Sequence, residues 1–213
     1  MATQIKAVIF DYGGVLCFHP TEDQIARAAA KCGLESREFV RALWKNRTAY
    51  DAGQDPNEYW SDIARSVGRT FDAPLIAQMI ECEIDFWSRF DTRPLDWIQQ
   101  LRSAGARTGI LSNLPRPLGG HLRGRDGFLQ HFDHITFSFE LNVVKPQRAI
   151  YEHAVRGLNV APEHALFLDD RPENVAGARA AGLHAELYSS WEDFVKETPA
   201  RYELPAPAVA RRQ

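Results

Sequence analysis

The 213-residue sequence predicts an α/β fold: a doubly wound parallel sheet with a small α-helical cap inserted after the first strand. Three observations lead to this fold class. An apolar run over residues 5–10 ends on Asp11 and turns at once through Gly13 and Gly14. A long stretch with apolar residues at helical spacing follows it. From Pro94 onward, short apolar strands alternate with helical patterns, which is typical of βαβ units.

The first apolar run has the composition of a strand that is buried on both faces. A carboxylate that follows such a strand lies where open α/β sheets bind their ligands. Gly13 and Gly14 carry no Cβ atom, so the backbone after Asp11 can come close to a ligand. We therefore take Asp11 as the first candidate functional residue.

The stretch 18–90 is expected to be all helical, with helices over 21–31, 35–48, 56–67 and 73–88. Thr21, Ser36 and Asp55 are residue types that commonly begin helices, and the last is followed by a proline. The aromatic side chains of this stretch are candidates either for its own core or for a pocket, with the core favoured for most of them; they are Phe39, Trp44, Tyr50, Tyr59, Trp60, Phe86 and Trp87.

The remainder predicts helices over 94–104, 147–156 and 172–181 and strands over 107–111, 134–138, 165–169 and 183–188. Residues 115–127 are rich in Gly, Pro and Arg and are expected to form a loop. The resulting domain prediction is a core of residues 1–17 and 91–198, a cap of residues 18–90, and a flexible tail over 199–213.

The composition excludes several classes of function. The net charge of −3 gives no basic field for nucleic acid or an anionic membrane surface. Three cysteines without CxxC spacing support neither a disulfide framework nor a zinc site. No apolar run reaches the length of a membrane span, and the N-terminus does not resemble a signal peptide. We expect a cytoplasmic monomer or homodimer that binds no nucleic acid and no membrane.

Three further polar clusters lie near predicted strand ends: Ser112-Asn113, Lys145-Pro146 and Asp169-Asp170. Because the carboxyl ends of parallel strands meet at one edge of a sheet, these clusters are expected to meet Asp11 there. Carboxylates are the ligands that Mg²⁺ prefers, and a lysine with a hydroxyl group suits a phosphate. The set therefore predicts a site for Mg²⁺ and a phosphorylated small molecule.

In this order, the four clusters resemble the four motifs of the haloacid dehalogenase superfamily, and the helical insertion resembles its small cap. The resemblance implies a nucleophilic, metal-binding Asp11, a metal-binding backbone carbonyl at Gly13, direct metal binding by Asp170 and an indirect role for Asp169. It also implies that Lys145 joins nucleophile and phosphate, and that phosphate is bound by Ser112, Asn113 and Arg116, although a solvated loop arginine is an equal alternative for the last of these.

The implied activity is a Mg²⁺-dependent phosphatase that acts on a small, sugar phosphate-like metabolite through an aspartyl-phosphate. One position departs from the usual pattern. Phosphatases of this superfamily carry a second aspartate two residues after the nucleophile, as general acid and base, and here that position is Gly13. Members with a glycine-type first motif resemble active sugar phosphatases. Tyr12, His19 and water are candidate replacements for the missing acid.

Two alternatives remain open from the sequence. The first is a 2-haloacid dehalogenase, which uses the same aspartate without metal; that family has Asp-x-Tyr in its first motif, whereas Tyr12 follows Asp11 directly. The second is a domain of this superfamily that has lost turnover and serves as a binding protein. The adjacent Asp169 and Asp170 argue for a cation and therefore against the dehalogenase.

Overall fold

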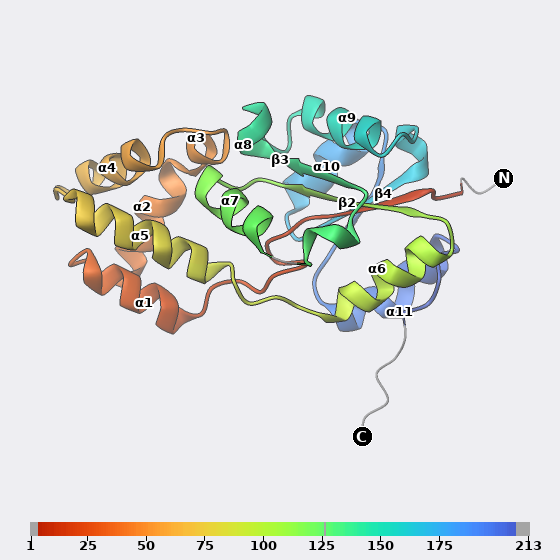
Figure 1. Cartoon of the computed structure of the whole chain (residues 1–213), viewed down its shortest axis with the longest axis horizontal. Coiled ribbons are helices and arrows are strands. Elements are labelled where there is room, and N and C mark those ends of the chain that lie inside the picture. The colour runs from red at the N-terminus through yellow and green to blue at the C-terminus, as the bar shows by residue number, and fades with distance from the viewer. Residues whose placement is uncertain (1–3, 126, 208–213) are drawn as a thin grey trace, which may run out of the picture.

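The computed structural model describes residues 4–125 and 127–207. Within these residues, five strands form one fully parallel sheet in the order β3-β2-β1-β4-β5 (Figure 1). The strands are β1 (Ala7–Phe10), β2 (Arg107–Ser112), β3 (His134–Phe137), β4 (Ala165–Asp169) and β5 (His184–Leu187). This order places the first strand in the centre, between the two strands that carry further polar clusters. The predicted fold class is confirmed.

Helices cover both faces of the sheet, which makes it doubly wound (Figure 1). Side chains of β1 alternate between two apolar clusters: Ile9 packs with α9 and α10, whereas Phe10 packs with α6 and α11. The helices that follow the first crossover are α6 (Arg93–Ser103), α7 (Arg116–Gly124), α8 (Ser138–Leu141), α9 (Arg148–Gly157), α10 (Pro172–Ala180) and α11 (Trp191–Arg201), with short 3₁₀ turns at Leu129–His131 and Pro162–His164.

Five helices between β1 and α6 lie to one side of the sheet (Figure 1). They are α1 (Glu22–Lys31), α2 (Ser36–Lys45), α3 (Arg47–Asp51), α4 (Pro56–Ser66) and α5 (Ala73–Phe86). Thr21 and Asp55 cap α1 and α4 through their side chains, as their residue types predict. These helices have an apolar cluster of their own, which includes Phe39 and Trp60. We propose on this basis that 18–90 is a cap domain on a core of residues 1–17 and 91–198.

The segment 115–127 differs from its prediction, because α7 occupies most of it. Pro117 lies in the first turn, where a missing N–H costs the helix nothing. Gly119 is required by packing, since a Cβ atom there would overlap the ring of Phe139. The expected loop is therefore wrong: these residues suit tertiary contacts of a helix, which local propensity does not reveal.

The expected flexible tail from residue 199 is also wrong over its first part. Helix α11 continues through Pro199 to Arg201, and the Trp97 indole donates a hydrogen bond of 2.7 Å to the carbonyl of Pro205. Packing against the core therefore fixes the chain as far as residue 205. Residues 208–213 lie outside the described part of the structure.

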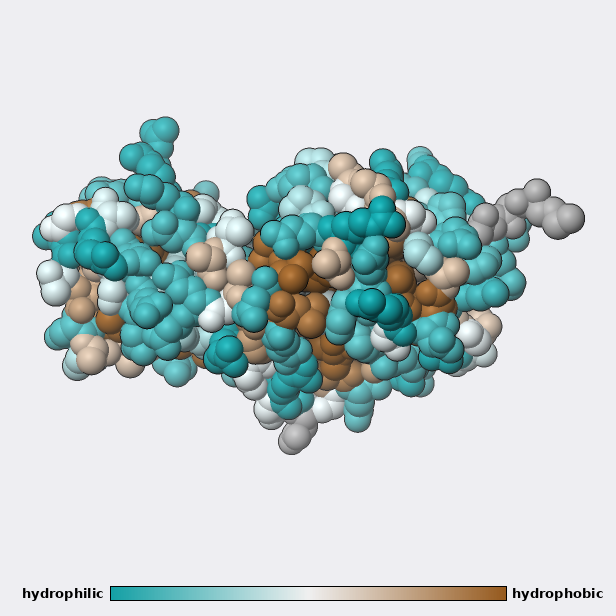
Figure 2. Space-filling model, turned by 90° about the horizontal axis from the view of Figure 1, so that it is seen from above, coloured by the Kyte–Doolittle hydropathy of each residue, from teal (hydrophilic) through white to brown (hydrophobic). Residues whose placement is uncertain are grey.

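The surface seen in Figure 2 is mainly hydrophilic, with apolar atoms gathered in the middle of that face. Among the helices of residues 4–125 and 127–207, none combines the length and apolarity needed to cross a membrane. Cys17, Cys32 and Cys82 are free, as the absence of a disulfide pattern predicts.

Candidate active site

Three neighbouring strands bring their polar residues to one edge of the sheet. Asp11 follows β1, Ser112 ends β2 and Asp169 ends β4, and the register pairs Phe10 with Ile110 on one side and Leu168 on the other. This register puts Asp11 level with Asp169, and Ser112 one residue further along its strand. All three residues are buried. The predicted convergence of strand ends therefore follows from the parallel pairing.

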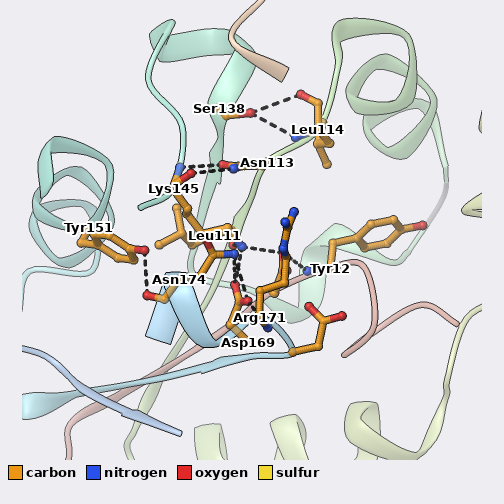
Figure 3. A network of polar contacts seen from close by, with 12 residues as sticks. Tyr12, Leu111, Asn113, Leu114, Ser138, Lys145, Tyr151, Asp169, Arg171 and Asn174 are labelled. Carbon is orange, nitrogen blue, oxygen red and sulfur yellow. Dashed lines mark hydrogen bonds and ion pairs between the residues drawn. The ribbon is translucent and has the colours of Figure 1, made fainter. Parts of the chain in front are cut away.

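Lys145 lies at the centre of this group (Figure 3). Its Nζ lies 2.9 Å from Oδ1 of Asp11 and 2.6 Å from Oδ2 of Asp169, and it donates a 3.1 Å hydrogen bond to the carbonyl of Leu111. The side chain is 1% exposed. A buried ammonium with two carboxylates and one carbonyl satisfies its three donors, so its geometry is fixed. Lys145 thus joins the two strand ends.

Asn113 holds the backbone of Lys145 in place (Figure 3). Its Oδ1 accepts from the Lys145 N–H at 2.8 Å, and its Nδ2 donates to the Lys145 carbonyl at 3.0 Å. Both polar atoms of the Asn113 side-chain amide are engaged by this pair of bonds with one residue. Its role at the site is therefore positional, which leaves only its backbone N–H as a candidate for phosphate binding.

Asp169 is held by further donors from its own loop and from α10. Oδ1 accepts from the Arg171 N–H at 2.8 Å, and Nδ2 of Asn174 lies 3.0 and 3.1 Å from the two carboxylate oxygens. Tyr151 in turn donates a hydrogen bond of 2.9 Å to the carbonyl of Asn174 (Figure 3). Every oxygen of Asp169 therefore has a protein partner, and the side chain is completely buried.

Asp170 is arranged differently. Its Oδ2 lies 3.0 Å from Nε2 of His19, and its side chain keeps 19% of its surface exposed. Gly14 makes this position possible: its φ is +76°, and a Cβ atom there would overlap the Asp170 carboxylate. Asp170 is thus the aspartate of the pair that faces the open side of the site.

The electrostatics of the group favour a cation. Oxygen atoms of Asp11, Asp169 and Asp170 lie within 4.8 Å of one another, against the single ammonium of Lys145. Burial raises the pKa of Asp11 to about 7 although Lys145 lowers it, and the charge of Asp169 adds to the rise. Burial acts to lower the pKa of Lys145, but the two carboxylates outweigh it and raise that pKa. A divalent cation on the three carboxylates would balance this excess of negative charge.

A cavity of about 80 Å³ opens over these residues. Its floor includes Asp11, Ser112, Lys145 and Asp170 from the sheet side. Its other wall comes from the helices of residues 18–90, which contribute Trp44, Arg47, Asp51 and Trp87. The site therefore lies between the strand ends and the helical insertion, and both contribute to its lining.

The structure brings together seven of the eight residues that the sequence singles out: Asp11, Gly13, Ser112, Asn113, Lys145, Asp169 and Asp170. Arg116 is the exception. It is exposed at the start of α7, its guanidinium lies 5.3 Å over the ring of Phe139, and it does not line the cavity. The proposed contact of Arg116 with phosphate therefore has no support in this arrangement.

Three charged lining residues were not among the predicted site residues: Arg47, Asp51 and Arg171. Arg171 follows the Asp169-Asp170 pair directly, which was a usable signal. Arg47 and Asp51 lie four residues apart in α3, a spacing of opposite charges that also occurs on many solvent-exposed helices. Of the aromatic candidates, Trp44 and Trp87 line the cavity, whereas the other five are buried.

Comparison with known proteins agrees with this geometry. The model of the haloacid dehalogenase-like hydrolase family matches residues 5–182. A sesquiterpene phosphatase of Aspergillus oryzae is 27% identical over 86% of this chain and 89% of its own length. A glyceraldehyde 3-phosphate phosphatase of Methanopyrus kandleri is 25% identical over 84% of this chain and 82% of its own length.

A similar fold occurs in a solved enzyme of the same family from Bacteroides thetaiotaomicron, whose crystals contain magnesium and inorganic phosphate. The TM-score is 0.69 at 19% identity, over 89% of this chain and 98% of that one. The match of the family model covers both the strand-end residues and the helical insertion. This chain belongs to the family of haloacid dehalogenase-like hydrolases.

Proposed function

We propose that the protein is a Mg²⁺-dependent phosphatase that hydrolyses a small phosphorylated metabolite through an aspartyl-phosphate on Asp11. The observation that carries the proposal is Lys145, which contacts both Asp11 and Asp169 in a buried cluster with excess negative charge. The phosphatase names of two relatives support it. A sugar phosphate-like substrate, and membership of the glycine-type branch, stay predictions from the sequence.

The donor set suits magnesium. Asp11 and Asp170 offer carboxylate oxygens, and Gly13 would add its backbone carbonyl. Asp169 has all its oxygens in protein hydrogen bonds, which supports a role in orienting Lys145 and the adjacent loop. When bound, the ion would neutralise negative charge on the aspartates and on the phosphoryl oxygens.

The residues of the chain perform the transfer in two steps. A carboxylate oxygen of Asp11 attacks phosphorus and forms a new O–P bond, while the bond from phosphorus to the ester oxygen breaks. Lys145, the Ser112 hydroxyl and the Asn113 N–H stabilise the phosphoryl oxygens. Gly13 offers no acid, so the leaving oxygen takes its proton from water or from His19, which lines the cavity. Water then attacks the aspartyl-phosphate, which releases phosphate and restores the Asp11 carboxylate.

Two assays on the purified full chain test the proposal: release of p-nitrophenol from p-nitrophenyl phosphate with and without Mg²⁺, and release of chloride from 2-chloropropionate. We expect p-nitrophenol release that requires Mg²⁺ and stops in excess EDTA, and no chloride. Chloride release in EDTA would indicate a dehalogenase instead. Binding of inorganic phosphate without turnover of either compound would indicate a domain that only binds.

The two adjacent aspartates should respond differently to substitution. For Asp170→Asn, we expect the Mg²⁺ concentration for half-maximal activity to rise more than about a hundredfold, because a direct ligand is lost. For Asp169→Asn we expect a rise of about 10–100-fold, typical of an orienting residue. Thermal unfolding should show the reverse order, since Asp169 contacts Lys145 and Asp170 does not. Equal Mg²⁺ effects would contradict this assignment of roles.

The packing around Gly13 explains why this position carries no acidic side chain. A Cβ atom on Gly13 would lie 3.0 Å from the Trp87 ring, so that ring occupies the space of a side chain here. We expect Gly13→Asp alone to lower the melting temperature, and Gly13→Asp with Trp87→Ala to raise kcat on alkyl phosphates by about 10²-fold over Trp87→Ala. Turnover of p-nitrophenyl phosphate, whose leaving group needs no proton, should change little. A stable double variant without this selective gain would show that another group already supplies the proton.

A further inference from the structure

A second cavity lies beside the first, within the helices of residues 18–90. It measures about 30 Å³ and shares Trp44, Arg47 and Trp87 with the cavity over Asp11. The rest of its wall is apolar except for one carboxylate; the residues are Pro20, Ile25, Val40, Leu43, Glu83 and Phe86. The three shared wall residues place the two cavities side by side.

The one cation in this wall is already neutralised. Arg47 donates from Nε to Oδ1 of Asp51 at 2.8 Å and forms an ion pair with Glu83 through Nη1. All three side chains are largely buried, and their charges sum to −1. Burial raises the pKa of Asp51 to about 6 although Arg47 lowers it. The cluster therefore repels a second phosphate or a carboxylate on the organic part of a substrate.

The same wall is unsuited to a chain of hydroxyl groups. Each hydroxyl that enters must give up its hydrogen bonds to water, and the apolar residues around the cavity return none. Of the two charged side chains that line it, Arg47 is paired with Oε1 of Glu83, and Oε2 of Glu83 is a single buried acceptor without a partner, which is too little for several hydroxyl groups. A hydrocarbon group loses nothing on entry and gains from leaving water. The cavity therefore favours hydrocarbon groups over groups that carry several hydroxyls.

We propose that this second cavity receives the organic part of the substrate, and that the substrate is a monophosphate ester of a short, uncharged aliphatic alcohol. The proposal rests on the phosphatase function proposed above and narrows its substrate class away from sugar phosphates. A volume of 30 Å³ holds about two to three water-sized groups, which corresponds to as many methyl or methylene groups. Selection is therefore by length as well as by polarity.

A series of n-alkyl phosphates from ethyl to octyl tests both properties, because their leaving groups differ little in basicity. With the full chain and saturating Mg²⁺, kcat/KM should rise about fourfold per methylene over two or three consecutive lengths. It should then level off or fall once the cavity is full. Glycerol 3-phosphate, the polar counterpart of propyl phosphate, should have a kcat/KM at least tenfold below the best alkyl phosphate.

A pair of variants locates the effect in this cavity. Val40→Phe adds bulk inside it and should reduce the ratio of kcat/KM between the best alkyl phosphate and ethyl phosphate at least tenfold. Ala77→Phe introduces the same side chain on the exposed side of α5 and should keep the wild-type series. A fully retained ratio in folded Val40→Phe would overturn the proposal.

The wild-type series decides the question even where Val40→Phe does not fold. If p-nitrophenyl phosphate is hydrolysed with Mg²⁺ but the series is flat, or glycerol 3-phosphate matches the best alkyl phosphate, the substrate class is wrong and the phosphatase function stands. If no phosphate ester is hydrolysed, the phosphatase function fails and this inference fails with it.

Discussion

Replacing Asp11 by asparagine is expected to remove hydrolysis while the fold is kept. Asparagine has nearly the same shape, and its Oδ1 can still accept from the Tyr12 N–H and from Lys145, which lie 2.7 and 2.9 Å from Oδ1 of Asp11. Its amide cannot attack phosphorus, and it is a poorer ligand for Mg²⁺. We expect turnover of p-nitrophenyl phosphate to fall below the detection limit, measured with saturating Mg²⁺.

The control for this variant is its thermal unfolding, which should be cooperative and close to that of the wild type. Removing one of two buried negative charges beside Lys145 does not leave that lysine unpaired, since Asp169 remains 2.6 Å away. Residual turnover above about a tenth of wild type, a change of less than about 1.4 kcal/mol in the barrier, would contradict the role of Asp11 as nucleophile.

Replacing Lys145 by methionine should have the largest effect on stability. The side chain fits the same volume, but Asp11 and Asp169 are left facing each other in the interior without their cation. Breaking a buried ion pair on one side typically costs about 3–5 kcal/mol. We expect a loss of this size in the free energy of unfolding, measured with urea, and no hydrolysis.

Two further variants make that measurement specific. Lys196→Met removes a lysine from an exposed pair with Asp193 and should leave the urea midpoint close to wild type. Lys145→Met combined with Asp11→Asn should be more stable than Lys145→Met alone, because one of the two unpaired charges is gone. Equal stability of Lys145→Met and of the double variant would show that Asp11 does not interact with Lys145 in the folded protein.

The strand-end residues of the site could be predicted because parallel pairing is regular. Once β1 lies between β2 and β4, the ends of the three strands meet at one edge of the sheet, which brings Asp11 level with Asp169 and within one residue of Ser112. Lys145 lies in no strand; its place near this edge was expected from its cluster, but its contact with the nucleophile was implied only by the resemblance of its motif. Neither line of reasoning gave the bonds by which Asn113 fixes it, because an Asn after a strand has many possible partners.

The contributions of the helical insertion could not be predicted in the same way. A helix shows which of its faces is apolar but not what that face meets, so the approach of Trp87 to Gly13 has no signature in either segment. The same reason explains why α7 was not predicted. In the sequence Gly119 indicates a break in a helix, and only the packing of Phe139 against it shows why a glycine is needed there. The position of the Arg116 side chain could not be predicted for a simpler reason. Its spacing from Asn113 fixes its place in the chain but not the direction in which its side chain points.

The division of the cavity wall between sheet and cap has a consequence for how such a protein can change. The side chains assigned to the reaction lie outside residues 18–90, whereas Trp44, Arg47 and Trp87 all belong to that one continuous insertion. Substitutions within that insertion can alter which organic group is accepted without touching a reacting atom. The substrate preference of this chain can therefore change by substitutions in the insertion alone, in evolution or in design, while Asp11, Lys145 and Asp170 stay the same.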